Sequence, residues 1–106
     1  LLVKAGAELE AKNKNGDTPL ILTAVDGRVD CVDLLVKAGA ELEAKNKNGD
    51  TPLILTAVDG RVDCVDLLVK AGAGLDAKDK LGRTPLFYAA YNGHADCIIL
   101  LVKAGA

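Results

Sequence analysis

The sequence predicts an all-α solenoid, a stack of short helical repeats in which each unit buries its apolar side against its neighbours. Two observations support this prediction. Residues 1–33 and 34–66 are identical letter for letter, and a diverged third copy begins at Leu67. The chain then runs seven residues, LLVKAGA, into a fourth copy. A fixed period of this kind favours an extended binding surface and suits catalysis poorly.

The composition fits a single globular domain of 106 residues. Half of the residues are hydrophobic and 26% are charged, a balance that is not typical of disordered chains. The net charge of −2 provides no basic field for nucleic acid or for anionic lipid, so we expect neither as a partner. The longest apolar run, residues 19–25, is far shorter than a membrane span.

Three cysteines, Cys31, Cys64 and Cys97, recur with the repeat period. Equivalent positions of stacked helices lie about 8–10 Å apart, and a disulfide needs α-carbons closer than about 7 Å. The same spacing prevents the three thiols from sharing a metal ion. We therefore expect buried, reduced cysteines in an intracellular, cytoplasmic protein.

Each repeat predicts two short helices and an extended finger. In the middle copy, the Asn48-Gly49 pair favours a tight turn. Thr51 is expected to cap a helix that begins at Pro52, and an apolar stripe over 62–70 predicts a second helix. Applied to the whole chain, the pattern predicts helices near 18–25, 29–38, 51–58, 62–71, 84–91 and 95–104, and fingers centred on 13–17, 46–50 and 79–83.

Two short motifs recur with the period. One is G-x-T-P-L, which first occurs at Gly16 to Leu20, and the other is L-L-V-K-A-G-A at 34–40, 67–73 and 100–106. The period, both motifs and the two-helix layout resemble the ankyrin repeat family over the whole chain, with three repeats, two of them identical. The resemblance implies a curved stack whose concave face, made of finger tips and first helices, binds a protein. It implies neither catalytic residues nor a cofactor.

The resemblance also sets the expected organisation, which is one ankyrin array over 1–106. We expect a partial repeat at 1–14, repeats at 15–47 and 48–80, and an incomplete repeat at 81–106. We further expect this array to be part of a longer one, with flanking ankyrin repeats. The identity of two copies is consistent with tandem duplication, deliberate design or assignment by repetition.

Three patterns that resemble chemical sites fail on their context. Residues 72–77 match G-x-G-x-x-A, but a helix precedes them where dinucleotide binding needs a strand. His94 lies three residues before Cys97, but no second histidine or convergent carboxylate orients it. The recurring Asp residues are spaced by a repeat and do not converge as a hard cation requires. We therefore expect no catalytic, cofactor or metal site.

The third repeat differs most from the others. Its first helix holds all three aromatic residues of the chain, Phe87, Tyr88 and Tyr91, while Leu81 and Arg83 replace Asn and Asp on its finger. Tyr and Arg are enriched among residues that dominate binding energy. The predicted partner-binding residues are Lys14, Asn15, Asp17, Val25, Asp26, Lys47, Asn48, Asp50, Val58, Asp59, Lys80, Leu81, Arg83, Tyr91 and Asn92.

Two other functions remain open at this point. The chain is alternatively a structural spacer without a specific ligand, which the identity of two repeats favours because an asymmetric partner usually needs different side chains on each rung. It is alternatively the targeting arm of an enzyme that lies outside this chain. Tyr91 has its own alternative role, which is packing against a following repeat.

Overall fold

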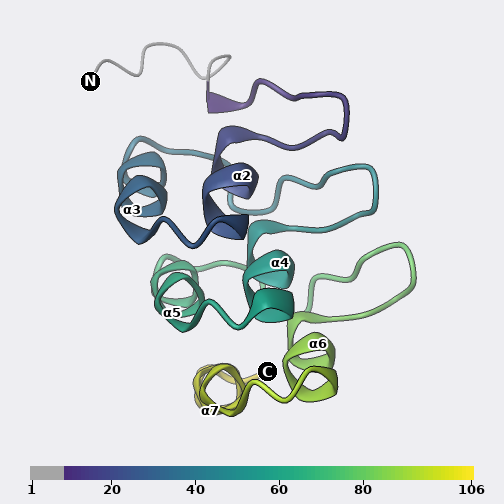
Figure 1. Ribbon diagram of the computed structural model, residues 1–106. Helices are drawn as coiled ribbons and strands as arrows, with labels where there is room; N and C mark the ends of the chain where they lie inside the picture. Colours follow the sequence, from purple (N-terminus) through teal and green to yellow (C-terminus); the bar gives the residue numbers. More distant parts are fainter. Residues whose placement is uncertain (1–8) are drawn as a thin grey trace.

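A computed structural model describes residues 9–106 of the protein. In this range the chain forms six helices and no β-strand (Figure 1). Each helix lies within one residue of its predicted bounds, so the prediction of an all-α solenoid is confirmed. The helices are α2 (Pro19–Val25), α3 (Val29–Lys37), α4 (Pro52–Asp59), α5 (Val62–Lys70), α6 (Pro85–Tyr91) and α7 (Ala95–Ala104).

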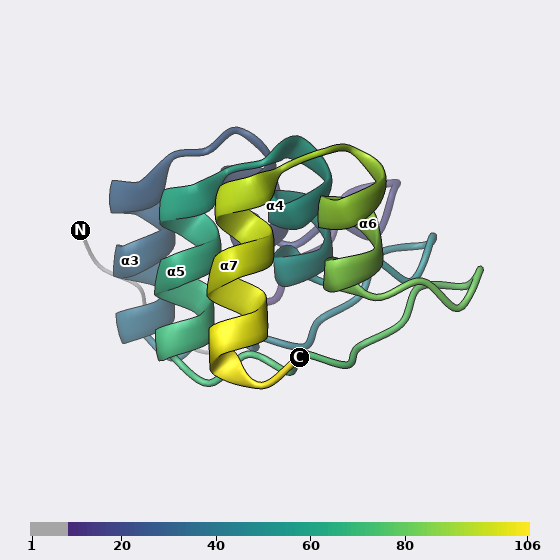
Figure 2. The same ribbon diagram turned by 90° about the horizontal axis from the view of Figure 1, so that it is seen from below.

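The helices form two layers, as the two ribbon views show (Figures 1 and 2). The first helices α2, α4 and α6 stack in one layer, and the second helices α3, α5 and α7 stack in the other. The fingers project from the side of the first helices. We call each finger, together with the helix pair that follows it, a unit: unit 1 is 13–37, unit 2 is 46–70 and unit 3 is 79–104.

Each first helix begins as the sequence predicts, with a threonine cap followed by proline. The Thr18 hydroxyl accepts a hydrogen bond from the backbone N–H of Ile21 at 3.3 Å, and Thr51 and Thr84 make the equivalent bond at 3.2 Å. The cap satisfies an N–H group that has no partner inside the helix. Proline fits the next position because its missing N–H is not needed there.

The core lies between the two layers and between successive units. Helix α4 packs against α2, α5 and α6, and its side chains Leu53, Ile54 and Ala57 are at most 1% exposed. This burial explains why the helix is apolar nearly all round. Among the described helices, none is long and apolar enough to cross a membrane.

The expectation of three buried cysteines is wrong for Cys31, which is exposed, whereas Cys64 and Cys97 are each 1% exposed. Helices α5 and α7 each pack against a preceding second helix, which covers their cysteine. Within the described residues no second helix precedes α3. The position of the unit in the stack therefore decides the burial, since Cys31 and Cys64 belong to identical copies.

Candidate partner-binding surface

The three fingers have the same local structure, built around one side-chain acceptor. In unit 2, Asn46 Oδ1 accepts hydrogen bonds from the backbone N–H of Asn48 at 2.9 Å and of Asp50 at 3.0 Å. Asn13 makes the same pair of bonds in unit 1, and Asp79 makes it in unit 3. A short side-chain oxygen at this position replaces a backbone acceptor and tightens the turn.

Backbone hydrogen bonds fix the fingers side by side. The N–H of Lys47 donates to the carbonyl of Asn15 at 3.0 Å, and the N–H of Lys80 donates to that of Asn48 at 3.1 Å. Gly49 lies at this contact with φ +78°, and a Cβ there would be 2.9 Å from the Lys80 nitrogen. Only glycine combines the left-handed conformation with such a close approach.

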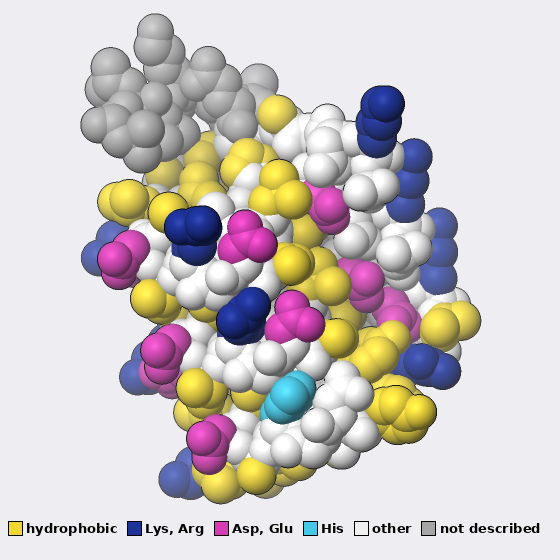
Figure 3. Space-filling view, in the orientation of Figure 1, with side chains coloured by type: hydrophobic (Ala, Val, Ile, Leu, Met, Phe, Trp, Pro, Cys, Tyr) yellow, Lys and Arg dark blue, Asp and Glu magenta, His cyan; other side chains and the backbone are white. Residues whose placement is uncertain are grey.

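Lysines of two kinds occupy the fingers. Lys12 and Lys45 donate their ammonium groups to the carbonyls of Lys45 and Lys78 on the next finger, at 3.3 and 3.0 Å. Lys14, Lys47 and Lys80 are exposed near the tips. Basic side chains therefore line the edge formed by the fingers, and acidic side chains lie beside them, nearer the helices (Figure 3).

All fifteen predicted partner-binding residues lie on the fingers or at the C-terminal ends of the first helices, and none is buried. Four of them, Asp17, Asp50, Val25 and Val58, are half-buried, and the others are exposed. We call these fifteen residues the ladder surface. Successive fingers contact one another and so do successive first helices, so equivalent residues of this set lie in register along the stack.

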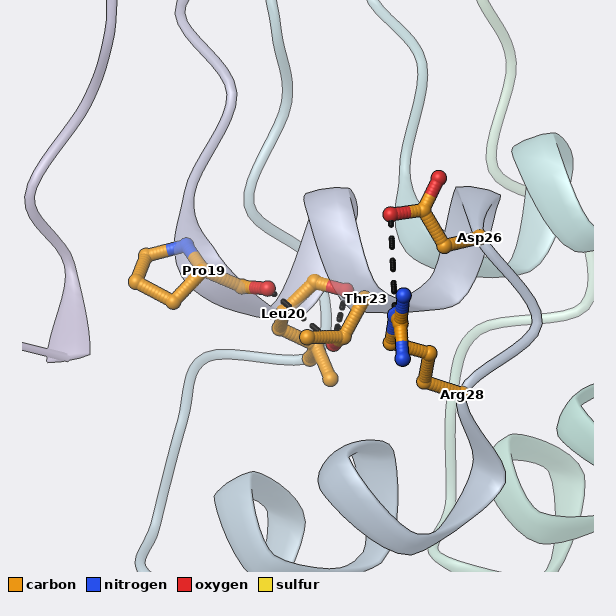
Figure 4. A network of polar contacts seen from close by, with 5 residues as sticks. All are labelled: Pro19, Leu20, Thr23, Asp26 and Arg28. Carbon is orange, nitrogen blue, oxygen red and sulfur yellow. Dashed lines mark hydrogen bonds and ion pairs between the residues drawn. The ribbon is translucent and has the colours of Figure 1, made fainter.

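The helix end of unit 1 shows how weakly some of these residues are held (Figure 4). Asp26 Oδ2 lies 3.9 Å from Arg28 Nε, and both side chains are mostly exposed. Ion pairs of this kind contribute roughly 0–1 kcal/mol. The Thr23 hydroxyl is occupied, because it donates to the carbonyls of Pro19 and Leu20 at 3.0 and 3.1 Å. Because its ion pair with Arg28 is long and exposed, Asp26 can exchange this partner for another at little cost.

Asn92 has a structural contact that the sequence reasoning missed. Its Nδ2 donates to the carbonyl of Val58 at 3.1 Å, and His94 Nε2 lies 2.9 Å from the same oxygen. Asn92 and His94 of unit 3 thus join this unit to unit 2. Asn92 replaces Asp26 and Asp59 of the other units. This change from an acceptor to a donor is the feature of the sequence that could have indicated the contact.

Unit 3 ends the ladder surface with an aromatic and basic cluster. The rings of Phe87 and Tyr91 are stacked, with centroids 5.8 Å apart and planes 11° from parallel. The Arg83 guanidinium carbon lies 5.2 Å from the Phe87 centroid. Tyr91 and Leu81 are 78% and 71% exposed. The stacked rings of Phe87 and Tyr91 thus keep aromatic surface in contact with water.

Two residues that the sequence reasoning did not select, Asp79 and Tyr88, lie next to Asp50 where the fingers of units 2 and 3 meet. Burial, the Asp79 carboxylate and the Asp17 carboxylate raise the pKa of Asp50, and the Asn46 amide partly offsets them. Tyr88 donates its hydroxyl proton to Asp79 Oδ2. A surface hollow of about 370 Å³ lies beside these contacts, and its lining includes Asp50, Asp79 and Tyr88.

The pKa of Asp79 itself moves in the opposite direction to that of Asp50. Burial alone raises it, but the hydrogen bond from Tyr88, the backbone N–H groups of Arg83 and Leu81 and the Arg83 charge together lower it. The hydrogen bond to Asp79 is also the main cause that raises the pKa of the Tyr88 hydroxyl. The signal in the sequence is that Asp79 replaces the asparagine found at position 46.

The surroundings of the two buried thiols, Cys64 and Cys97, disfavour their ionised form. Burial raises the pKa of Cys64 and of Cys97, and the neighbouring Asp63 and Asp96 raise it further. A raised pKa disfavours the thiolate, which is the nucleophilic form. Within residues 9–106, no group of three or more His, Cys, Asp or Glu side chains is arranged to hold a metal ion.

The fold and the stacked fingers define a helical repeat protein with a continuous surface. A family model of ankyrin repeats matches three copies, over residues 1–79 and 38–106. The chain therefore belongs to the ankyrin repeat family. Members of this family are generally protein–protein interaction modules and are typically non-catalytic. No curated protein matches the chain.

Proposed function

We propose that the protein is a non-catalytic scaffold that binds a protein partner on its ladder surface, the concave face of the stack, with unit 3 as the anchor. One observation supports the choice of unit 3 above all. Leu81, Arg83 and Tyr91 are exposed together there, whereas the equivalent positions of units 1 and 2 carry Asn, Asp and Val. Aromatic and Arg side chains are enriched among residues that dominate binding energy.

The stacking of Tyr91 on Phe87 supports this role physically. A tyrosine loses little side-chain entropy for the area that it buries. Contact with the Phe87 ring, itself covered by the Arg83 guanidinium, restricts Tyr91 further before any partner arrives. Preorganisation of this kind lowers the cost of ordering an interface.

The ladder-surface residues of units 1 and 2 fit a supporting role in binding the partner. Units 1 and 2 present the same side chains twice, with exposed lysines at the finger tips and carboxylates nearer the helices. Such positions exclude water around an anchor and set the orientation of the partner more than they add affinity. The identical side chains of units 1 and 2 favour the alternative function, a spacer without a specific ligand. The experiment must therefore distinguish a binding scaffold from a spacer.

The experiment immobilises the full chain and captures proteins from the source cells. The matched control is a triple variant, Leu81→Asn, Arg83→Asp and Tyr91→Val, which gives unit 3 the residues that units 1 and 2 tolerate. A scaffold retains a defined protein on the native chain that the variant loses, and the purified pair then binds with a measurable Kd. A spacer retains the same proteins on both chains, which would contradict the proposal.

A further inference from the structure

One lysine lies near the tip of each finger, at the same position of every unit. These residues, Lys14, Lys47 and Lys80, are exposed, and we call them the lysine row. Lys14 and Lys47 are exposed although a further finger follows each of them, so their exposure does not depend on the end of the stack. Figure 3 shows Lys and Arg side chains one above another along the edge formed by the fingers.

Backbone contacts hold the lysine row in register. The N–H of Lys47 donates to the carbonyl of Asn15, which directly follows Lys14. The N–H of Lys80 donates in the same way to the carbonyl of Asn48. Successive members of the row therefore lie one unit apart along the stack, a step of about 8–10 Å for packed helices.

The charge of the lysine row is not neutralised by ion pairs among residues 9–106. Every ion pair in this range lies between the two helices of unit 1 or on a second helix: Asp26–Arg28, Asp33–Lys37 and Asp66–Lys70. Lys12 and Lys45 add further positive charge beside the row, and backbone carbonyls of the next finger hold their ammonium groups. The fingers thus carry a line of positive charge.

This line of charge becomes stronger towards the proposed anchor in unit 3. Asp17 and Asp50 each lie three residues after a member of the lysine row, whereas unit 3 has Arg83 at that position. Arg83 is exposed, like the adjacent Lys80 side of the finger tip. A negatively charged segment that leaves the anchor is therefore attracted along the fingers from unit 3.

We infer that the lysine row binds an extended acidic segment of the protein partner, with a carboxylate at every third residue. The inference rests on the proposed function and adds the chemistry of the partner. A polyproline II segment has three residues per turn and rises about 3.1 Å per residue, so every third side chain points the same way at intervals of about 9 Å. This interval matches the step of the row, whereas a β-strand repeats its face about every 7 Å.

The carboxylates beside the row favour such a segment over a nucleic acid. Asp17 and Asp50 are half-buried on the same fingers, and the net charge of the protein is −2. A strand with a charge on every residue places some of its phosphates near these carboxylates, and like charges brought together disfavour a partner. A segment with two neutral residues between its carboxylates avoids this repulsion.

The probe is a synthetic peptide of three Glu-Pro-Pro triplets, one for each finger. It is titrated into the isotope-labelled full chain at about 10 mM salt, where the screening length is about 30 Å. Backbone amide shifts in NMR spectra report the binding site and a Kd in the millimolar range. The control peptide has the same composition with its glutamates adjacent. We expect the largest shifts at all three finger tips, and binding about twofold or more tighter for the spaced peptide, because adjacent glutamates reach fewer fingers.

A matched pair of triple variants separates the lysine row from net charge. The test variant removes the row: Lys14→Gln, Lys47→Gln and Lys80→Gln. The control variant removes one lysine per unit from the second helices: Lys37→Gln, Lys70→Gln and Lys103→Gln. Both variants lose the same charge. The test variant should bind the spaced peptide about threefold or more weakly, the combined effect of three exposed ion pairs, and the control variant should lose less.

Three results would overturn the inference. The first is the absence of shifts at the finger tips at about 10 mM peptide, well above a millimolar Kd. The second is an equal loss of binding in the two variants. The third is tighter binding of a single-stranded oligonucleotide of equal charge, because the row would then take any polyanion. These outcomes are separate from the capture experiment, in which loss of a protein by the Leu81, Arg83 and Tyr91 variant supports the proposed function by itself.

Discussion

The ring of His94 lies against Gly60 of the preceding unit, so closely that a Cβ on Gly60 would be 2.5 Å from His94 Nδ1. On its other side the ring reaches the carbonyl of Val58 through Nε2. Arg61 approaches Gly27 in the same way, and a Cβ on Gly27 would be 2.9 Å from its Cδ. A side chain of each later unit thus closes the junction over a glycine of the unit before it.

This contact predicts that Gly60→Ala destabilises the protein more than Gly93→Ala. Both glycines have a positive φ, +69° and +73°, so both variants incur backbone strain of about 1–2 kcal/mol. Only Gly60 has atoms against its Cβ position, since nothing lies within 4 Å of that of Gly93. We expect a further loss of about 1 kcal/mol for Gly60→Ala, measured by urea unfolding. Equal losses would show that the ring moves aside freely.

The different burial of the three cysteines predicts that a thiol reagent labels only one of them rapidly in the native protein. Cys31 is exposed and should react rapidly with a thiol reagent. Cys64 and Cys97 are buried, and their raised pKa lowers the thiolate fraction at neutral pH, so both should react only as the protein unfolds. Mass spectrometry of the labelled peptides at successive times measures the three rates. Rapid labelling of Cys64 in the native protein would contradict the stacking of α5 on α3.

The raised pKa of Asp50 predicts that replacing this residue increases the free energy of unfolding by an amount that depends on pH. Its folded pKa lies above the unfolded value of about 3.8, so ionised Asp50 destabilises the native state at neutral pH and this penalty disappears as the pH falls through the folded pKa. Asp50→Asn should therefore raise the free energy of unfolding at pH 7 by about 0.2–1 kcal/mol, the range for exposed charges. The gain should shrink between pH 7 and pH 4.

The matched control for this prediction is Asp17→Asn. Asp17 already receives the Asn46 amide at 3.0 Å, so its replacement removes a charged acceptor as well as its repulsion of Asp50, and the gain at pH 7 should be smaller than that of Asp50→Asn. Urea midpoints of both variants and of the native chain at several pH values make the comparison. An equal gain at both positions would mean that net charge is responsible, and not the burial of Asp50 and the facing Asp79 carboxylate.

Of the substitutions on the ladder surface, we expect Tyr91→Ala to cause the largest loss of partner affinity. We expect a loss of about 2 kcal/mol or more, in the range of binding hot spots, because the side chain is 78% exposed and held by Phe87. Val25→Ala at the same position of unit 1 should cost less than about 1 kcal/mol. Titration calorimetry with the captured partner measures both. If Tyr91→Ala lowers stability and leaves affinity unchanged, Tyr91 only packs within the stack.

Much of the fold could be read from short-range chemistry. Thr-Pro pairs set the starts of the first helices, and glycines with positive φ, such as Gly72 after the C-cap residue Ala71 of α5, follow the ends of helices. These signals act within one turn of chain, so the same letters give helices with the same bounds to within one residue in units 1 and 2. The positions of the predicted partner-binding residues on one exposed surface followed from the same register.

The contacts between fingers were not predictable in this way. The bond from Asn46 to Asp17 and the effect of Asp79 on Asp50 each join residues 29 positions apart along the chain. A single sequence gives the repeat period but not which side chains of two adjacent fingers meet. The role of Tyr88 as the donor to Asp79 was hidden for the same reason, although it lies in a helix that was predicted correctly.

The sequence by itself determined the repeat, its helices, their caps and the turn of each finger, because these depend on neighbours in the chain. Only the tertiary structure decided burial, as the identical copies prove. Cys31 and Leu34 are exposed, whereas Cys64 is buried and Leu67 half-buried. The letters are the same and the local helices are the same, so burial depends on what packs over each helix, and α3 packs over α5.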